Sequence, residues 1–494
     1  MEVQPEAPPS PSASGKRPSE TDADPVGAKR VRLDTETDRE ITPNDHPSEK
    51  RQNNDEPKAP RLPKRACALL IGFSGAGYNG MQYQPAIQKV RTIEGTLFDA
   101  LVKAGGVSKD NADNPTKVGL GRAARTDAGV HAAGNVVSMK LIKDIPGVQD
   151  MVARINEELP PEIRLWSILR VSNNFDARTS CDSRKYTYFF PSYLTLPPKP
   201  GSGLHQVLQR NGTEFPSHPF WTAHSHLDAE SELRQKRAYR MSPDALELLR
   251  ATASKYLGTH NFHNFTIGRE FRDRSSNRHM KEISVADPVV YGNTEWVSIN
   301  FHGQSFMLHQ RKMMTALVLT CRTGTPPQII DELYGPRVVF TPKMPALGLL
   351  LEYPIFDGYN RKAAALSGNL DTSDPNHRPL INFEDHREQM EKFKTEHIYA
   401  RMREIEEEEA VFDAWIRHID AYSGDDLLWL NSKGIIPAAA VIQKGALRQN
   451  HFRERKRFNA TDRSVGASTS VDEEEAEESE EEGLDKGKLN DMEG

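Results

Sequence analysis

The residues best suited to chemistry lie in Gly121–Ala132, which reads GRAARTDAGVHA. Asp127 follows Arg125 by two positions, in a stretch too rich in Gly and Ala to be ordinary core. A nearby guanidinium keeps a carboxylate ionised and fixes its oxygens, as required of a group that attacks carbon or removes a proton. An isolated Arg-x-Asp is more often a surface ion pair in a turn, so the rest of the chain must decide.

An aromatic strand offers a second group of candidate residues. Strand alternation over Arg184–Phe190 places Tyr186 and Tyr188 on one face, with Arg184 beside them. A phenol can stack on a nucleobase and also form a hydrogen bond. Isolated tyrosines at this spacing are more often part of an ordinary buried strand.

A glycine-rich segment raises the alternative of a dinucleotide site. Gly75–Gly80 fits G-x-G-x-x-G and follows an apolar run, but a helix must begin at such a loop so that its N-terminus meets the pyrophosphate. Here the next helical pattern begins only near Thr92, which argues against a nicotinamide-dependent enzyme.

Apolar patterning predicts the elements that position these residues. Strands are expected at 66–73, 135–141, 163–171, 184–190, 289–291 and 295–301, and helices at 92–104, 152–159, 242–257 and 306–321. Alternating strands and helices indicate an α/β or α+β sheet protein with two sheet-and-helix halves, about 63–192 and 236–360. A flexible polar insertion, 195–235, separates the halves, and charged helices are predicted within a 361–440 extension.

The charge distribution predicts a polyanionic partner. Residues 1–60 carry 9 basic and 13 acidic side chains and residues 361–494 carry 19 and 30, so 36 basic and 27 acidic side chains remain in the core. The core is therefore basic between acidic flanks, which suits a polyanion. Residues 1–62 and 441–494 are too polar to bury a core, and we expect both ends to be disordered.

The N-terminal segment predicts the compartment. Lys16-Arg17 and Lys29–Arg32 read as a nuclear import signal for an import receptor, although a solvated charge run is the simpler reading. Three widely spaced cysteines argue for a reducing, intracellular environment and against a disulfide framework. No apolar run is long enough for a membrane span.

Taken in order along the chain, five segments resemble the TruA family of tRNA pseudouridine synthases. They are Phe73–Gly95, Gly121–Ala132, Phe175–Tyr188, Gly303–Met314 and Pro345–Glu352. The resemblance covers about residues 65–360. It implies the pseudouridine synthase fold, with the two halves forming a basic RNA cleft, and isomerisation of uridine in tRNA without a cofactor. Other RNAs, such as snRNA and mRNA, are further candidate substrates.

The same resemblance implies roles for individual residues. Asp127 corresponds to the catalytic aspartate, Tyr186 to the tyrosine against the target base, and Leu350 to an apolar residue of the base pocket. Arg125 is expected to fill the space that a flipped nucleotide leaves. Four further residues are expected to contribute to substrate binding: Arg122, His131, Arg184 and Arg311.

One departure from the family pattern concerns Arg311, which is expected to pair with Asp127. The family has an apolar residue between Gln and Arg, and here Arg311 follows Gln310 directly. Each residue turns a helix by about 100°, so the missing residue would rotate Arg311 away from the helix face that points to Asp127. The pairing is kept only if the deletion is absorbed at the start of the helix. The alternative hypothesis is therefore a catalytically impaired RNA-binding or RNA-folding protein.

Two histidines raise the question of zinc. His260 and His263 could be ligands of a structural zinc, but no cysteine pair accompanies them. We therefore expect no metal site, and we expect both histidines to have structural roles. The sequence leaves the modified uridines and the oligomeric state open.

Overall fold

The structure is a computed structural model that describes residues 62–84, 90–443, 451–455 and 458. The basic clusters at Lys16-Arg17 and Lys29–Arg32, and the ends expected to be disordered, lie outside these residues, apart from short stretches at the inner margins of the two ends. In the described part of the chain, no helix combines the length and the apolar character needed to cross a membrane.

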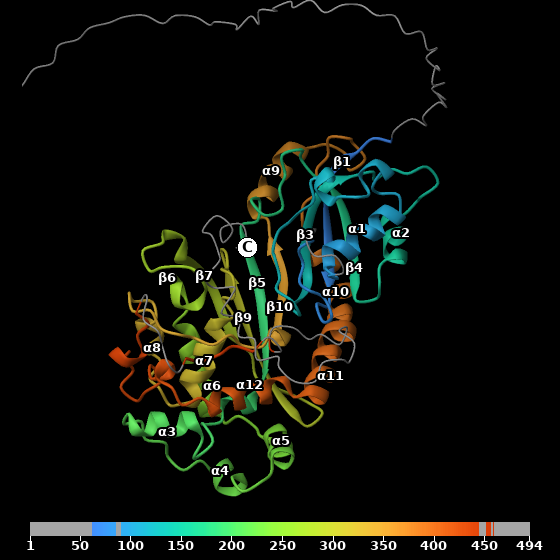
Figure 1. Cartoon of the computed structure of the whole chain (residues 1–494). Helices are drawn as coiled ribbons and strands as arrows, with labels where there is room; N and C mark the ends of the chain where they lie inside the picture. The colour runs from blue at the N-terminus through green and yellow to red at the C-terminus, as the bar shows by residue number, and fades with distance from the viewer. Residues whose placement is uncertain (1–61, 85–89, 444–450, 456–457, 459–494) are drawn as a thin grey trace, which may run out of the picture. The chain divides into compact units, whose positions relative to one another are not determined.

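One ten-stranded mixed sheet organises the fold, with strand order β4-β1-β3-β10-β5-β9-β7-β6 and with β2 and β8 paired to β3 and β9 (Figure 1). The strands are β1 Arg65–Phe73, β2 Gly121–Arg122, β3 His131–Leu141, β4 Ile163–Arg170, β5 Ser183–Pro191, β6 Gly258–Asn261, β7 Asn277–Val285, β8 Val289–Tyr291, β9 Thr294–Gly303 and β10 Leu349–Ile355. This arrangement confirms the expected mixed α/β class.

The last strand of the core, β10, lies in the middle of the sheet. It runs parallel to β3, where Leu350 is opposite His131, and antiparallel to β5, where Leu351 is opposite Tyr186. The strands that precede residue 171 lie on one side of β10, and those from residue 183 onward lie on the other. β10 therefore joins the strand that follows the Asp127 loop to the strand that carries Tyr186.

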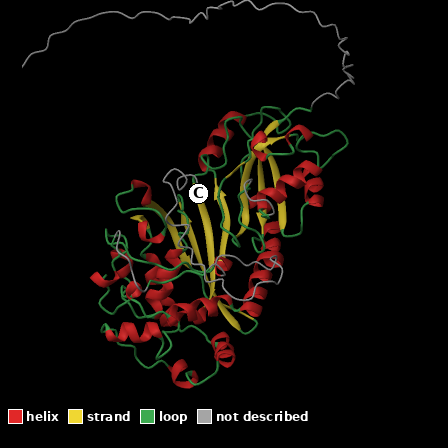
Figure 2. Ribbon diagram, in the orientation of Figure 1, coloured by secondary structure: helices red, strands yellow, loops and turns green. Residues whose placement is uncertain are grey.

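Helices cover the sheet (Figure 2). The longer ones are α1 Ile93–Lys103, α2 Met151–Glu158, α3 Gly203–Arg210, α5 Ala229–Ala238, α6 Pro243–Ser254, α7 Lys312–Arg322, α9 Asp357–Ser367, α11 Ala400–Glu409 and α12 Val411–Ala421. α1 and α2 share a buried cluster with one face of β1 and β4, and α6 and α7 share another with β5 and β9. α10 Arg387–Phe393 shares a third cluster with β1, β3 and β10.

Helix-start signals account for several of these elements. Thr92 accepts a hydrogen bond from the Gly95 backbone at the start of α1, and Ser242 accepts one from Ala245 at the start of α6, where proline occupies the first turn. These helices confirm the sequence prediction within a few residues.

Two predictions for the second half differ from the structure. The helix expected from Phe306 begins at Lys312, because residues 304–311 form turns instead. β6 and β7 were not predicted, because β6 has only four residues and β7 has few apolar ones. Segment 195–235 contains α3, the short helix α4 Pro219–His224 and the start of α5.

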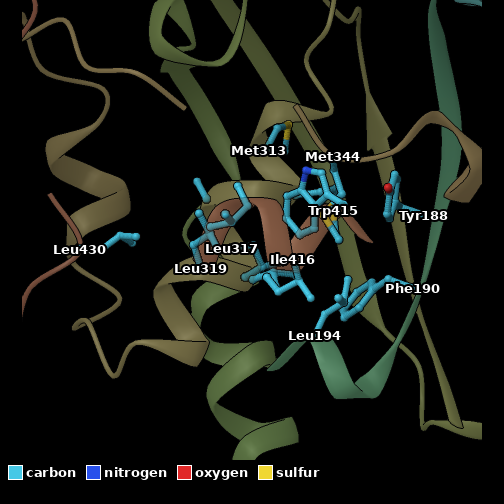
Figure 3. Packing of buried hydrophobic residues seen from close by; sticks show 14 of the residues in the cluster. Tyr188, Phe190, Leu194, Met313, Leu317, Leu319, Met344, Trp415, Ile416 and Leu430 are labelled. Atoms are coloured by element: carbon cyan, nitrogen blue, oxygen red, sulfur yellow. The ribbon is translucent and has the colours of Figure 1, made fainter. Parts of the chain in front are cut away.

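The C-terminal extension is integrated into the core of the second half. Trp415 of α12 is fully buried in one cluster with Tyr188, Met313 and Met344 (Figure 3). A buried ion cluster also ties α12 to α5, since Lys236 Nζ lies 2.7 Å from Glu232 and 2.9 Å from Asp413. The extension is therefore part of the same core as the aromatic strand β5.

Candidate active site

Asp127 lies in the loop between β2 and β3, which is held by backbone contacts on both sides. The Asn135 side chain pairs with the backbone of Ala124 through two hydrogen bonds of 2.9 and 3.2 Å. Across the loop, Met81 N–H donates to the carbonyl of Thr126 at 3.1 Å. This loop is thus fixed by two other segments before any side chain of the site acts.

The glycine-rich segment is the partner that packs against the Asp127 loop. Gly80 has φ +81°, and a Cβ there would lie 2.7 Å from the carbonyl oxygen of Thr126. No helix begins at this loop, because α1 starts only at Ile93. The glycines therefore permit close backbone approach, and the geometry of a dinucleotide site is absent from this segment.

A pocket of about 540 Å³ opens beside Asp127. Its wall combines the 79–84 loop, the Asp127 loop, the aromatic strand β5 and the turns before α7. The residues that line it include Arg125, Asp127, Tyr186, Tyr188, Phe306, Leu308, His309, Arg311 and Leu349. Its size and its mixture of apolar walls with a few charged groups are typical of a site for a small ligand or a single base.

Arg311 contacts Asp127 directly. Its Nη1 donates to Asp127 Oδ2 at 3.3 Å, and His309 Nδ1 lies 3.5 Å from the same oxygen. The Arg311 side chain is 1% exposed, whereas the Asp127 side chain is 30% exposed toward the pocket that it lines. The buried cation therefore orients a carboxylate that solvent or substrate can still reach.

The turn before α7 explains how Arg311 reaches Asp127 despite the shortened sequence. His309 adopts φ +57°, and Lys312, the next residue after Arg311, begins the helix. Gln310 closes the turn through its side chain, which accepts a hydrogen bond from Met307 N–H at 2.7 Å. The missing residue is thus absorbed ahead of the helix, and Arg311 is not rotated away from the site.

The surrounding charges keep Asp127 ionised. Burial would raise the pKa of this carboxyl, but His309, Arg311 and Lys343 together lower the pKa below its ordinary value. Burial lowers the pKa of His309 to about 3, so the imidazole is neutral near pH 7. Arg311 and Lys343 therefore supply the positive charge that keeps Asp127 an anion at that pH.

Tyr186 faces the same pocket as a neutral phenol. Burial raises the pKa of Tyr186 to about 12, and the charge of Arg184 opposes that rise only in part. Its ring meets Phe306 edge-on, with centroids 4.7 Å apart. The pocket thus combines a carboxylate, a phenol and an aromatic wall, a set able to hold a planar base and transfer a proton.

Comparison with known proteins identifies the family. Residues 252–357 match the tRNA pseudouridine synthase family. The chain is 41% identical over 415 residues to tRNA pseudouridine synthase 1 of Eremothecium gossypii, which spans 74% of this chain and 76% of that protein. The chain belongs to the TruA family of tRNA pseudouridine synthases. It is therefore a pseudouridine synthase, an isomerase.

Two relatives from one organism give a finer comparison. tRNA pseudouridine synthase 1 of Saccharomyces cerevisiae is 40% identical over 414 residues, which is 74% of this chain and 73% of that protein. The tRNA pseudouridine(27/28) synthase of the same yeast is 38% identical over 326 residues, which is 60% of this chain and 85% of that protein. The first similarity extends over more of the chain than the second.

Three residues expected to bind substrate have other positions in this pseudouridine synthase. Arg122 pairs with buried Glu94, and His131 accepts from the Gly75 backbone at 3.1 Å. Arg184 donates to the carbonyl of Ala123 at 2.7 Å. None of the three lines the pocket.

Leu350 does not line the pocket. Leu350 is buried in the cluster on the opposite face of the sheet, with Leu70 and Phe393. Leu349, which pairs with Tyr188, lines the pocket instead. Neighbouring strand residues point to opposite faces, so an error of one position exchanges the pocket for the core behind it.

Sequence reasoning did not predict His309 or Lys343. His309 lies two positions before Arg311 in the same short motif, and this spacing could have indicated that it contacts Asp127. Lys343 is buried, and its backbone is held from the C-terminal extension by Glu454, which accepts from Lys343 N–H at 2.7 Å, and by Trp415, which donates to its carbonyl at 2.8 Å. No local sequence pattern indicates these contacts between Lys343 and the C-terminal extension.

The two histidines considered for zinc have ordinary structural contacts. His260 Nε2 lies 2.6 Å from the carbonyl of Leu257, and its ring stacks on Tyr334. His263 Nδ1 lies 3.1 Å from Asn261 Oδ1. Within the described ranges, no group of three His, Cys, Asp or Glu side chains is placed to hold a metal ion.

Proposed function

We propose that this family member isomerises uridine to pseudouridine in tRNA, with Asp127 as its catalytic carboxylate. The observation that carries the proposal is Asp127 itself, an ionised and partly exposed side chain that lines a base-sized pocket beside Tyr186. A uridine inside a stem must leave the stack to enter such a pocket, at a cost of a few kcal/mol. Arg125 lines the same pocket, and we assign to it the role of filling the vacated space and contacting phosphate.

The reaction is an internal rearrangement. Asp127 attacks the sugar or base, or removes a sugar proton, and the bond between N1 and C1′ breaks. The freed uracil turns and a bond forms between C5 and C1′, while the bond to Asp127 breaks or the sugar proton is returned. The proton on C5 is then lost and N1 gains one, so Asp127 is regenerated. Substrate and product are isomers, so the atoms and electrons balance without an oxidant, a reductant or a cofactor.

We assign the proton transfers to Asp127 with assistance from Tyr186. A phenol whose pKa is about 12 is a poor base at neutral pH but a good hydrogen-bond donor. Asp127 is the group in the pocket that is already ionised, so it accepts the C5 proton. Tyr186 and Leu349 line the pocket and would flank the uracil ring.

The finer parts of the proposal concern RNA and compartment. We propose that the two halves of the sheet form a basic RNA cleft, and that snRNA and mRNA are further substrates. The relatives differ in their names, one of which specifies positions 27/28, so positional preference varies within the family. Import into the nucleus through Lys16-Arg17 and Lys29–Arg32 is tested by fusing residues 1–60 to a reporter, and a cytoplasmic reporter would refute it.

The test of function measures tritium released from tRNA transcribed with 5-tritiated uridine. The purified full chain should release tritium, and Asp127→Asn should abolish release while leaving RNA binding largely intact. Asp113→Asn is a matched control, because Asp113 is an exposed carboxylate that pairs with Lys117 on the surface. Turnover near wild type in Asp127→Asn would refute the catalytic assignment.

A second candidate, a catalytically impaired RNA-binding protein, rests on the residue missing before Arg311. The contact of 3.3 Å between Arg311 and Asp127 weighs against it. Binding of tRNA by the wild-type chain without tritium release would favour it nonetheless.

A further inference from the structure

A cluster of basic side chains lies beside the pocket, on the loop and strand at the edge of the second half. Residues 268–281 contain five basic and two acidic side chains, a net charge of +3. We call the basic members the basic rim: Arg269, Arg272, Arg274, Arg278 and Lys281. Arg272, Arg274 and Lys281 are exposed, and no ion pair is recorded for these three among the described residues.

The basic rim is joined to the pocket wall by hydrogen bonds. Thr266, just before it, donates through its hydroxyl to the carbonyl of Leu308 at 2.8 Å. At its other end, the carbonyl of His279 accepts from Gln304 N–H at 3.0 Å. Leu308 lines the pocket, and Gln304 precedes Phe306, which also lines it, so the rim borders the wall that residues 306–311 form.

The loop is held in a defined shape that presents its arginines outward. Asn261 donates to the carbonyl of Phe271 at 2.7 Å, and the carboxylate of Asp273 accepts from Glu270 N–H at 3.1 Å. The Asp273 carboxylate and the Glu270 backbone thus help to build the loop. Phe271 remains 39% exposed between Glu270 and Arg272, with its ring 5.4 Å from that of His263.

This combination fits nucleic acid better than a protein partner. Exposed guanidinium groups such as those of Arg272 and Arg274 can bind phosphate oxygens, and an exposed aromatic ring offers a surface on which an unstacked base can lie. A nucleotide that enters the pocket brings its neighbours over the rim, because successive phosphates are joined covalently. β6 and β7 flank the loop, and β6 is the edge strand at this end of the sheet (Figure 1).

We propose that the basic rim binds the RNA backbone next to the target uridine, and that Phe271 stacks on a base displaced from the same strand. This inference rests on the proposed function, since it assumes that RNA delivers a uridine to the pocket. The rim sets affinity and register and takes no part in the chemical step. Its loss should therefore change KM and leave kcat unaltered.

The test uses the full chain with Arg272→Gln and Arg274→Gln combined. The KM for tRNA should rise roughly tenfold with kcat unchanged, and the slope of log affinity against log salt should fall by about 2, one for each lost phosphate contact. Arg387→Gln with Lys392→Gln is the matched control, because both residues are exposed and lie on α10, which packs on the other face of the sheet. That pair should leave KM and the salt slope unchanged.

A separate variant tests the stacking. Phe271→Leu keeps an apolar side chain but removes the ring face, and should raise KM without altering the salt slope, whereas Phe271→Tyr should behave as wild type.

The outcomes separate this inference from the proposed function. An active wild type whose rim variant keeps its KM and salt slope, or whose control pair weakens binding equally, overturns the rim proposal and leaves the function intact. A wild type that releases no tritium overturns the function instead, and the binding assay alone then judges the rim.

Discussion

Arg311 reaches Asp127 from a turn and not from a helix: its Nη1 lies 3.3 Å from Asp127 Oδ2, and the helix begins one residue later. The shortened motif therefore keeps the ion pair by placing His309 in a left-handed conformation. The contact between Arg311 and Asp127 therefore depends on the conformation of His309.

Arg311→Met should reduce turnover by roughly 10²- to 10³-fold, because it removes the buried cation that orients the carboxylate. The turnover of Arg311→Lys should lie between that of the wild type and that of Arg311→Met, since lysine keeps the charge without the planar guanidinium group. Single-turnover rates with saturating enzyme measure the chemical step directly. A methionine variant as fast as wild type would remove Arg311 from the mechanism.

His309→Val should destabilise the protein by about 1–2 kcal/mol more than His309→Asn does. A φ of +57° is costly for a β-branched residue, whereas asparagine adopts this conformation readily. Urea unfolding of the two variants gives the difference in the free energy of unfolding. Equal midpoints would mean that the turn relaxes without cost.

Lys343→Met should move the acidic limb of the rate–pH profile to higher pH. The native pKa of Asp127 is lowered in part by Lys343, so the active carboxylate is lost only when pH falls through that low value. Without Lys343 the pKa rises, and activity is lost at a higher pH during acidification. Lys343→Arg should restore the wild-type limb, and an unmoved limb in the methionine variant would contradict this.

Tyr186→Phe should lower kcat by roughly 10²- to 10⁴-fold with little change in KM. Because the pKa of Tyr186 is raised to about 12, the residue is a phenol throughout pH 6–9, and the loss should be constant over that range. Steady-state rates at several pH values test this. A loss that grows steadily toward alkaline pH would indicate that the wild type uses a phenolate.

Lys236→Met should cost about 1.5–3 kcal/mol of stability, because it removes the buried cation that Glu232 and Asp413 share, although Lys199 still pairs with Glu232 and Arg417 with Asp413. Arg154→Met, which breaks exposed pairs on α2, should change stability by at most about 1 kcal/mol. Urea midpoints measure both. Equal effects would show that the link between α5 and α12 contributes little.

Local patterns predicted much of this protein, including the helices α1 and α6 and the placement of Asp127 and Tyr186 on a loop and a strand. Such features are encoded within a few residues of one another. The motif around Asp127 also identified the family before any three-dimensional contact was known.

The failures share a different cause. Leu349 and Leu350 are equally apolar, and only the pairing of β10 with β5 decides which of them faces the pocket. Lys343 and the basic rim depend on contacts between segments far apart in the chain. Arg122 and Arg184 carry charges that suit RNA, but the fold uses them against Glu94 and the carbonyl of Ala123.

The central position of β10 has a consequence for how the protein is made. β3 and β5 are synthesised long before β10, and each waits with an unpaired edge until Leu349–Ile355 has left the ribosome. Such pairing across a long loop is slow, and open edges invite association with other chains. A chain that terminates before Leu349 would therefore be an aggregation-prone fragment in which the strand leaving Asp127 and the strand carrying Tyr186 are not joined.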